Sequence, residues 1–129
     1  MEFIEYPDRD MMFLQLADRI TSELGDCLRL HETASFCVPG GTTPGPIFDV
    51  LSEVNLDWDR VSVFLNDERW VGEDSPRSNT ALLRKHLLTG KAASAHLVPL
   101  YLPTPQPEDA LEALIAGFED ILPISVLLL

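Results

Sequence analysis

Basic residues are scarce in this 129-residue sequence, which holds nine Lys and Arg against 21 Asp and Glu and carries a formal net charge of -12. A protein that binds nucleic acid or an anionic membrane surface needs a basic patch, and the sequence contains no such stripe. We therefore expect neither a nucleic-acid nor a membrane partner. Binding of an anionic metabolite remains compatible with this charge. Salt screens the field of the whole protein over about 8 Å, so hydrogen-bond donors close to the site determine whether an anion binds.

Cysteine is also rare, and long apolar runs are missing. Cys27 and Cys37 lie on apolar stretches without metal-ligand spacing, which favours reduced core thiols and a cytoplasmic protein. The first residues lack the basic and apolar regions of a signal peptide, and no apolar run could span a bilayer. No repeat, low-complexity tract or linker is present, so we expect one domain over residues 1–129; no feature sets an oligomeric state.

Short apolar runs alternate with amphipathic segments along the chain. This alternation predicts an α/β fold with a mainly parallel sheet and helices on both faces, in a doubly wound, Rossmann-like arrangement. The spacing of apolar residues predicts helices over 8–30, 46–54, 79–88 and 108–122, and strands over 2–6, 34–38, 61–65, 97–100 and 124–129.

The last expected strand stops at Leu129 with no turn or helix after it. Ligands of open α/β sheets bind beyond the carboxyl ends of the strands, so a further site loop is expected there. We interpret the chain as the N-terminal part of a longer domain, incomplete at its C-terminus. The alternative is a complete small protein whose last strand ends the sheet, although an apolar edge strand would then be poorly covered.

The first candidate site is a Gly-Gly-Thr-Thr-Pro turn between an expected strand and an expected helix. Backbone N–H groups at such a helix start suit a phosphate. Gly40 and Gly41 permit close backbone approach, and Thr42 and Thr43 add hydroxyl groups. The pattern is neither GxGxxG nor a P-loop, because no Lys-Ser/Thr pair follows the glycines. The alternative is a tight turn with a threonine cap.

The second candidate site is Asn-Asp-Glu-Arg-Trp-Val at residues 66–71, directly after the expected strand 61–65. It should therefore share a sheet edge with the glycine turn. A neighbouring carboxylate can hold the Arg69 guanidinium in a fixed pose, ready to bind a phosphate or a developing oxyanion. The alternative is an exposed ion pair at a strand end, which contributes little to stability.

These two motifs, with Ser-Pro-Arg-Ser-Asn at residues 75–79, resemble the 6-phosphogluconolactonase family, which belongs with the glucosamine-6-phosphate deaminases. The likeness runs in order from the first helix to the last strand, and Trp-Asp-Arg-Val at 58–61 is similar to the family's lead into the second motif. The resemblance implies a cytosolic enzyme of the pentose phosphate pathway that needs neither metal nor cofactor. It would hydrolyse 6-phospho-D-glucono-1,5-lactone, a small phosphorylated sugar lactone, to 6-phosphogluconate.

The resemblance also implies roles for individual residues. Asp67 and Arg69 fall at the catalytic cleft, where we expect Arg69 to contact the anion or oxyanion and Asp67 to orient the base or the substrate. The residues implied in substrate or phosphate binding are Gly40, Gly41, Thr42, Thr43, Arg77, Ser78 and Asn79.

The sequence departs from the family pattern in three places. Thr42 replaces the usual serine but keeps a hydroxyl, and Gly72 stands where proline is common. The family's general base is a histidine in a Gly-His-Thr-Ala-Ser type segment, which His31, His86 and His96 do not match. We therefore expect the chain as given to lack the base and to be inactive by itself.

Three alternatives remain at this point. In a glucosamine-6-phosphate deaminase or isomerase, the carboxylate at Asp67 would shuttle the proton, but these enzymes carry Tyr where this chain has Arg69. A non-catalytic sugar-phosphate-binding protein would keep the anion loop without the base. A nucleotide-binding α/β domain is weaker, because no acidic residue is placed to hold a ribose.

Overall fold

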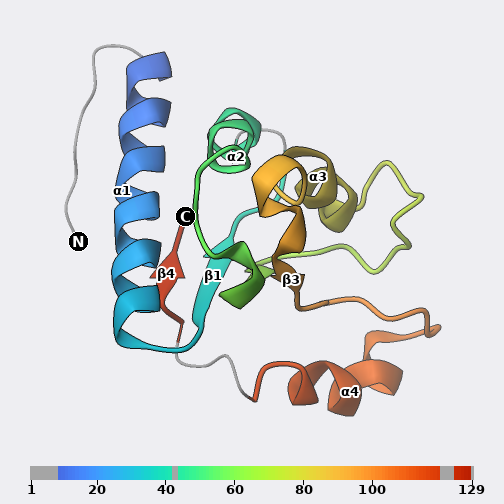
Figure 1. The fold of residues 1–129 in the computed structure, drawn as a ribbon. Helices are drawn as coiled ribbons and strands as arrows, with labels where there is room; N and C mark the ends of the chain where they lie inside the picture. Colours follow the sequence, from blue (N-terminus) through green and yellow to red (C-terminus); the bar gives the residue numbers. More distant parts are fainter. Residues whose placement is uncertain (1–8, 42–43, 120–123, 129) are drawn as a thin grey trace.

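The computed structural model describes residues 9–41, 44–119 and 124–128 (Figure 1). Its sheet has four parallel strands in the order β3-β2-β1-β4, and helices cover both of its faces. The expected parallel α/β architecture is therefore confirmed. The strands are β1 (Ala34–Val38), β2 (Val61–Leu65), β3 (His96–Leu97) and β4 (Val126–Leu127).

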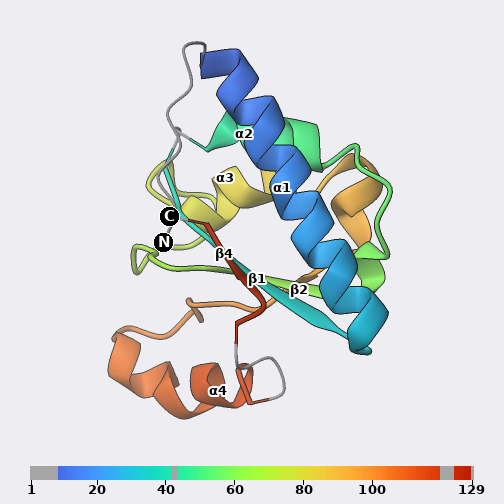
Figure 2. The same cartoon turned by 90° about the vertical axis from the view of Figure 1, so that its left-hand side faces the viewer.

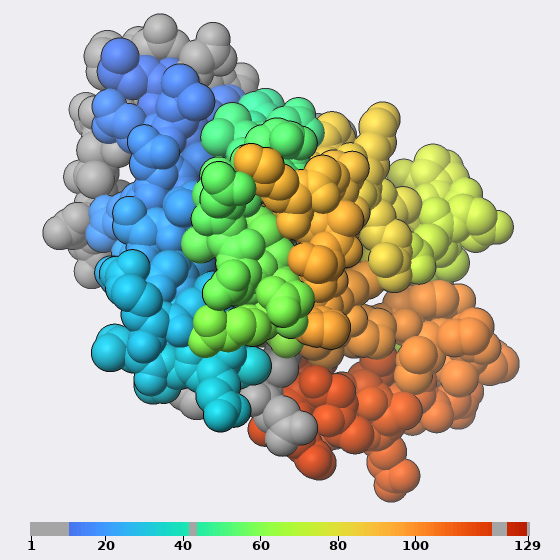
Figure 3. Space-filling view, viewed as in Figure 1, coloured from blue at the N-terminus to red at the C-terminus, as the bar shows by residue number. Residues whose placement is uncertain are grey.

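In the rotated view α1 (Arg9–Leu30), α2 (Gly45–Leu51) and α3 (Asn79–His86) lie on one side of the sheet, and α4 (Leu111–Ala116) lies on the other (Figure 2). In the space-filling view the segment around α4, in orange and red, forms a lobe beside the blue-to-green body (Figure 3). The 3₁₀ turns are η1 (Trp58–Arg60), η2 (Gly90–Ser94) and η3 (Pro107–Ala110).

Alternating side chains of the strands fill two separate cores. Phe36 and Val63 point to the side of α1, α2 and α3 and are fully buried there. Cys37 and Phe64 point to the opposite side, where the Phe64 ring meets Phe118 edge-on at a centroid distance of 5.0 Å. This two-residue period is what a strand buried on both faces requires. Both cysteines are free thiols.

Two of the expected strands are shorter in the structure. The strand expected over 97–100 is the two-residue β3, because Pro99 has no N–H to donate to a neighbouring strand. The strand expected over 124–129 is likewise reduced to β4. The expected strand over 2–6 lies outside the described residues.

Three of the expected helices also end early, and the one expected over 79–88 stops at His86. The helix expected over 46–54 begins at Gly45 and stops at Leu51, where the backbone tightens into i→i+3 hydrogen bonds. The helix expected over 108–122 opens with the 3₁₀ turn η3 and ends at Ala116, directly before Gly117. Glycine is a poor helix former, so the break falls where propensity is lowest.

Arg60 fastens the end of α1 to the start of β2. Its guanidinium donates to the carbonyl oxygens of Leu28 at 2.7 Å, His31 at 2.8 Å and Glu32 at 2.7 Å, and to the Asp57 carboxylate at 3.1 Å. Carbonyl groups at a helix end have no partner within the helix, so Arg60 satisfies groups that would otherwise need water.

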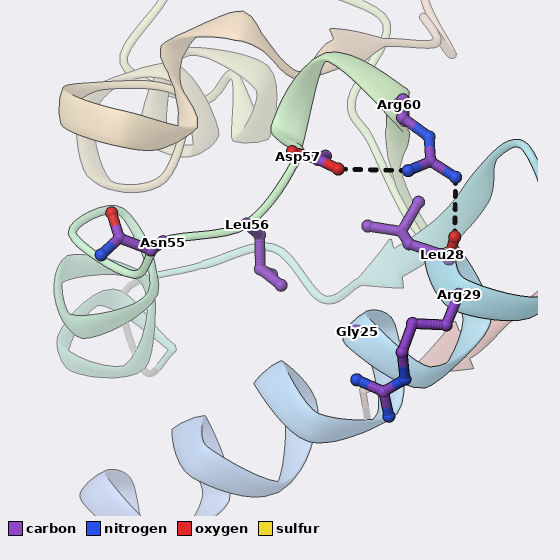
Figure 4. Close-up of a pocket in the computed structure, with 7 residues that line it drawn as sticks. All are labelled: Gly25, Leu28, Arg29, Asn55, Leu56, Asp57 and Arg60. Carbon is purple, nitrogen blue, oxygen red and sulfur yellow. Dashed lines mark hydrogen bonds and ion pairs between the residues drawn. The ribbon is translucent and has the colours of Figure 1, made fainter.

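A hollow of about 450 Å³ lies beside Arg60, at the edge of the sheet where β1 and β2 begin (Figure 4). Most of the Arg60 donors are already bound to carbonyl oxygens, and Arg29 is paired with Asp26. Trp58 is 1% exposed, and its Nε1–H donates to the Val54 carbonyl at 3.0 Å. The contacts of Trp58 and Arg60 together give the Trp-Asp-Arg motif a structural role.

Candidate functional site

The loops that follow β1 and β2 meet on the side chain of Asn79. The Gly41 N–H donates to Asn79 Oδ1 at 3.2 Å, and Arg69 Nη1 donates to the same oxygen, also at 3.2 Å. Asn79 Nδ2 donates to the Asp67 carbonyl at 3.2 Å. The two motifs therefore lie together at the carboxyl edge of the sheet, as the strand order predicts.

Gly40 and Gly41 are required by the geometry of this junction. Gly41 has a φ of +80°, in the left-handed region that side-chain-bearing residues rarely adopt. A Cβ added at Gly40 would lie 2.2 Å from Asn79 Nδ2, so no other residue fits without displacing that amide. Thr42 and Thr43, the other two residues expected in the phosphate loop, lie outside the described residues.

Arg69 is held differently from the sequence-based expectation. Its Nη1 donates to the Arg77 carbonyl at 3.0 Å and to Asn79 Oδ1 at 3.2 Å, rather than to a neighbouring carboxylate. Within the described part of the chain, Nε and Nη2 have no protein acceptor, and the side chain is exposed. Nε and Nη2 form one planar edge of the guanidinium, which can bind a carboxylate or phosphate with two parallel hydrogen bonds.

Glu68 is a residue that the sequence reasoning missed. Its Oε1 accepts from the backbone N–H groups of Arg69 and Asn79, both at 2.8 Å. Its Oε2 accepts from the Thr80 N–H at 2.7 Å and from the Thr80 hydroxyl. The carboxylate therefore ties the loop after β2 to the first turn of α3.

A sequence signal for this role exists in α3 itself. Ser78 is the N-cap, and its Oγ accepts from the Ala81 N–H at 3.1 Å. An N-cap side chain satisfies only one of the N–H groups that a first helical turn leaves without a partner. The N–H groups of Asn79 and Thr80 therefore need an acceptor from elsewhere, and Glu68 supplies it.

The contacts of Glu68 also set its charge. Burial raises the pKa of this carboxyl, but hydrogen bonds from the Thr80 hydroxyl and from the N–H groups of Asn79, Arg69 and Thr80 outweigh burial and lower it. Glu68 is therefore ionised at neutral pH, and its negative charge lies at the positive end of the α3 dipole. The N-terminus of α3 is consequently occupied by the protein's own carboxylate.

The other residues expected in the adjoining loop make contacts within the protein. Ser78 and Asn79 are 1% and 4% exposed, and their side-chain polar atoms bind the groups described above. Arg77 is exposed and contributes its carbonyl to Arg69. Contact of these three residues with a substrate stays a prediction.

Asp67 binds Asn79 through its backbone carbonyl. It is exposed and helps to line a hollow of about 480 Å³, whose far wall is formed by Glu108, Leu111 and Leu114. Trp70 also lines this hollow, and its Nε1–H donates to the Thr104 carbonyl at 2.8 Å.

The three histidines have other positions and partners. His31 follows α1 and His96 begins β3, so both belong to the edge of the sheet opposite Arg69. His86 Nδ1 lies 2.9 Å from Asp49 Oδ1. Over the described ranges, no group of three or more His, Cys, Asp or Glu side chains could hold a metal ion. The same ranges contain no helix long and apolar enough to cross a membrane.

The sequence model described as glucosamine-6-phosphate isomerases/6-phosphogluconolactonase matches residues 7–129. The chain belongs to this family. A 6-phosphogluconolactonase of Mesorhizobium japonicum is 42% identical over 81% of this chain and 44% of its own length. One from Pseudomonas aeruginosa is 41% identical over 88% of this chain and 48% of its own length.

Solved structures agree with the family assignment. A 6-phosphogluconolactonase from Shewanella baltica superposes with a TM-score of 0.90 at 32% identity, over 95% of this chain and 53% of its own. The Thermotoga maritima 6-phosphogluconolactonase gives a TM-score of 0.72 at 27% identity, over 84% of this chain and 50% of its own. The chain thus spans about half the length of the curated relatives that it matches.

Proposed function

We infer that this chain supplies the substrate-binding part of an enzyme that hydrolyses 6-phospho-D-glucono-1,5-lactone to 6-phosphogluconate. The observation that carries the proposal is the Nε–Nη2 edge of Arg69, which has no acceptor among the described residues and is held by Nη1 beside the glycine loop. Family membership narrows the substrate, because the relatives reported above are named 6-phosphogluconolactonases. Residues 1–129 would form one α/β unit of a longer lactonase domain.

The reaction needs three contributions. A base removes a proton from the attacking water, a donor stabilises the oxyanion formed at the ring carbonyl, and a remote contact holds the substrate in place. Arg69 is suited to the second task, since its guanidinium keeps its charge and its free edge offers two donors. The loop that contains Gly40, Gly41, Thr42 and Thr43 would hold the phosphate. Asp67, which is exposed on the same loop as Arg69, would orient the substrate or the base.

The family also contains glucosamine-6-phosphate isomerases, so an amino-sugar phosphate is the second candidate substrate. The fixed guanidinium of Arg69 favours the lactone. An oxyanion forms when water attacks a lactone carbonyl, and a cation poised to meet it accelerates that step. A protein that binds phosphosugars without turnover is the third possibility, and the experiment below separates all three.

The test measures two activities of the protein in the longest form that its gene encodes. These are the hydrolysis of 6-phospho-D-glucono-1,5-lactone and the release of ammonia from glucosamine 6-phosphate. We expect lactone opening only, with kcat reduced roughly 10²- to 10³-fold in Arg69→Ala. Arg29→Ala is the matched control, because Arg29 is an exposed arginine at the other edge of the sheet, and it should keep the wild-type rate. Wild-type hydrolysis by Arg69→Ala, or ammonia release alone, would overturn the proposal.

A further inference from the structure

We propose that Asn79 is a positioning residue that couples the glycine loop to the guanidinium of Arg69, rather than a residue that contacts the substrate. The proposal rests on the proposed function only in naming the ligand. The coupling itself is a property of hydrogen bonds that can be measured without any ligand.

The amide of Asn79 has little capacity left for a substrate. The residue is 4% exposed, its Oδ1 accepts two hydrogen bonds and its Nδ2 donates one to the Asp67 carbonyl. An amide oxygen has two lone pairs, so Gly41 and Arg69 together saturate it. Nδ2 keeps a second N–H, but the residue is so deeply buried that a ligand has little access to it.

The position of the amide is itself fixed from both sides. The Asn79 backbone N–H donates to Glu68 Oε1 at 2.8 Å, which places the residue at the start of α3. Gly40 packs so closely against the side chain that a Cβ there would lie 2.3 Å from Asn79 Cγ. The amide therefore cannot turn without moving the glycine loop.

This arrangement gives Asn79 an effect on two ligand-facing groups at once. By accepting from Nη1, it leaves the Nε–Nη2 edge of Arg69 outermost and sets the direction of that edge. By accepting from the Gly41 N–H, it places the glycine loop at a constant distance from the same guanidinium. An anion that spans both elements would then meet donors that are already in place, which reduces the ordering cost of binding.

The first experiment uses calorimetry to measure the affinity for 6-phosphogluconate of the same form of the protein as in the lactone assay. We expect Asn79→Ala to weaken binding roughly tenfold, as the loss of one well-placed charged hydrogen bond does. Arg69→Ala should weaken it at least as much, and the double variant should lose less than the sum of the two single losses, because part of the effect of Asn79 passes through Arg69. Asn55→Ala, at the opposite edge, is the matched control and should bind as the wild type does.

A role confined to folding would give a different pattern. Asn79→Ala would then lower the melting temperature but leave the affinity of the folded protein unchanged, which would overturn the proposal. Fully additive losses in the double variant would also overturn it, because they would mean that Asn79 is not coupled to Arg69.

The second experiment needs no ligand and therefore separates failure of this proposal from failure of the proposed function. In ¹⁵N spectra of the free chain, Asn79→Ala should shift the signals of the Gly41 amide and of the Arg69 Nε–H, and should speed hydrogen exchange at Gly41. If both signals stay unchanged, Asn79 does not couple the two loops. If the wild type fails to bind 6-phosphogluconate while these signals move, the proposed function fails and the coupling stands.

Discussion

Replacing Glu68 with glutamine should destabilise the protein because one carboxylate serves both the loop after β2 and the start of α3. Oε1 accepts from two backbone N–H groups, and Oε2 accepts from the N–H and the hydroxyl of Thr80. Glutamine keeps one of these oxygens and puts an NH₂ donor in place of the other. At least one backbone N–H group then faces another donor.

The size of the loss follows from these contacts. A buried donor left without its acceptor costs about 1–3 kcal/mol, and removing a negative charge from a helix N-terminus costs about 0.3–1 kcal/mol. We expect Glu68→Gln to lower the free energy of unfolding by about 2–3 kcal/mol, equivalent to a fall of roughly 6–12 °C in melting temperature for a domain of this size.

The pH dependence of this loss is a sharper test. Glu68 has a folded pKa below its ordinary value of 4.5, so its contribution is present above that pH and is lost as pH falls through the folded pKa. Urea unfolding at pH 7 should therefore separate the wild type from Glu68→Gln by the full amount. The separation should shrink steadily below about pH 4 as the wild-type carboxylate takes up a proton.

Glu73→Gln is the matched control for this experiment. Glu73 lies in the same loop and forms an ion pair with Arg84, but both side chains are about half exposed, at 47% and 52%. Its substitution should change stability by less than about 1 kcal/mol. Equal losses for the two variants, or a difference between wild type and Glu68→Gln that persists unchanged to pH 3, would refute the role assigned to Glu68.

Two further substitutions test the backbone and the far edge of the sheet. Gly41→Ala should lower the free energy of unfolding by about 1–2 kcal/mol, because alanine is strained at a φ of +80°. Gly25→Ala within α1 should raise it by about 0.5–1 kcal/mol, because an added Cβ there meets nothing closer than 3.8 Å. Urea unfolding measures both changes, and equal effects would contradict the geometry. Arg60→Met should cost about 2–3 kcal/mol by leaving the α1 carbonyl groups unpaired, and calorimetry would refute this if the loss matched that of Arg29→Met.

The central strands could be predicted from the sequence because their information is local. β1 and β2 have the expected bounds, since each is a five-residue run flanked by a residue that breaks the pattern, Pro39 after β1 and Asn66 after β2. Pro99 also indicates a short β3, but the apolar residues around it favoured a longer strand in the prediction.

The contacts that build the site could not be predicted in the same way. Glu68 and its donors at Asn79 and Thr80 are separated by 11 and 12 residues, and only the fold shows that they meet. The same holds for Arg60, which reaches carbonyl groups 28 to 32 residues away at the end of α1. The residue types of the two motifs predict where the site lies. The hydrogen-bond partners of each polar atom depend on tertiary packing and cannot be predicted from residue types.

A crystal structure of the chain with 6-phosphogluconate bound tests the account most directly. We expect an anionic group of the ligand within hydrogen-bonding distance of Nε and Nη2 of Arg69, with the rest of the molecule against the glycine loop that begins at Gly40. A ligand bound instead in the hollow beside Arg60, with the Arg69 edge facing only water, would contradict it.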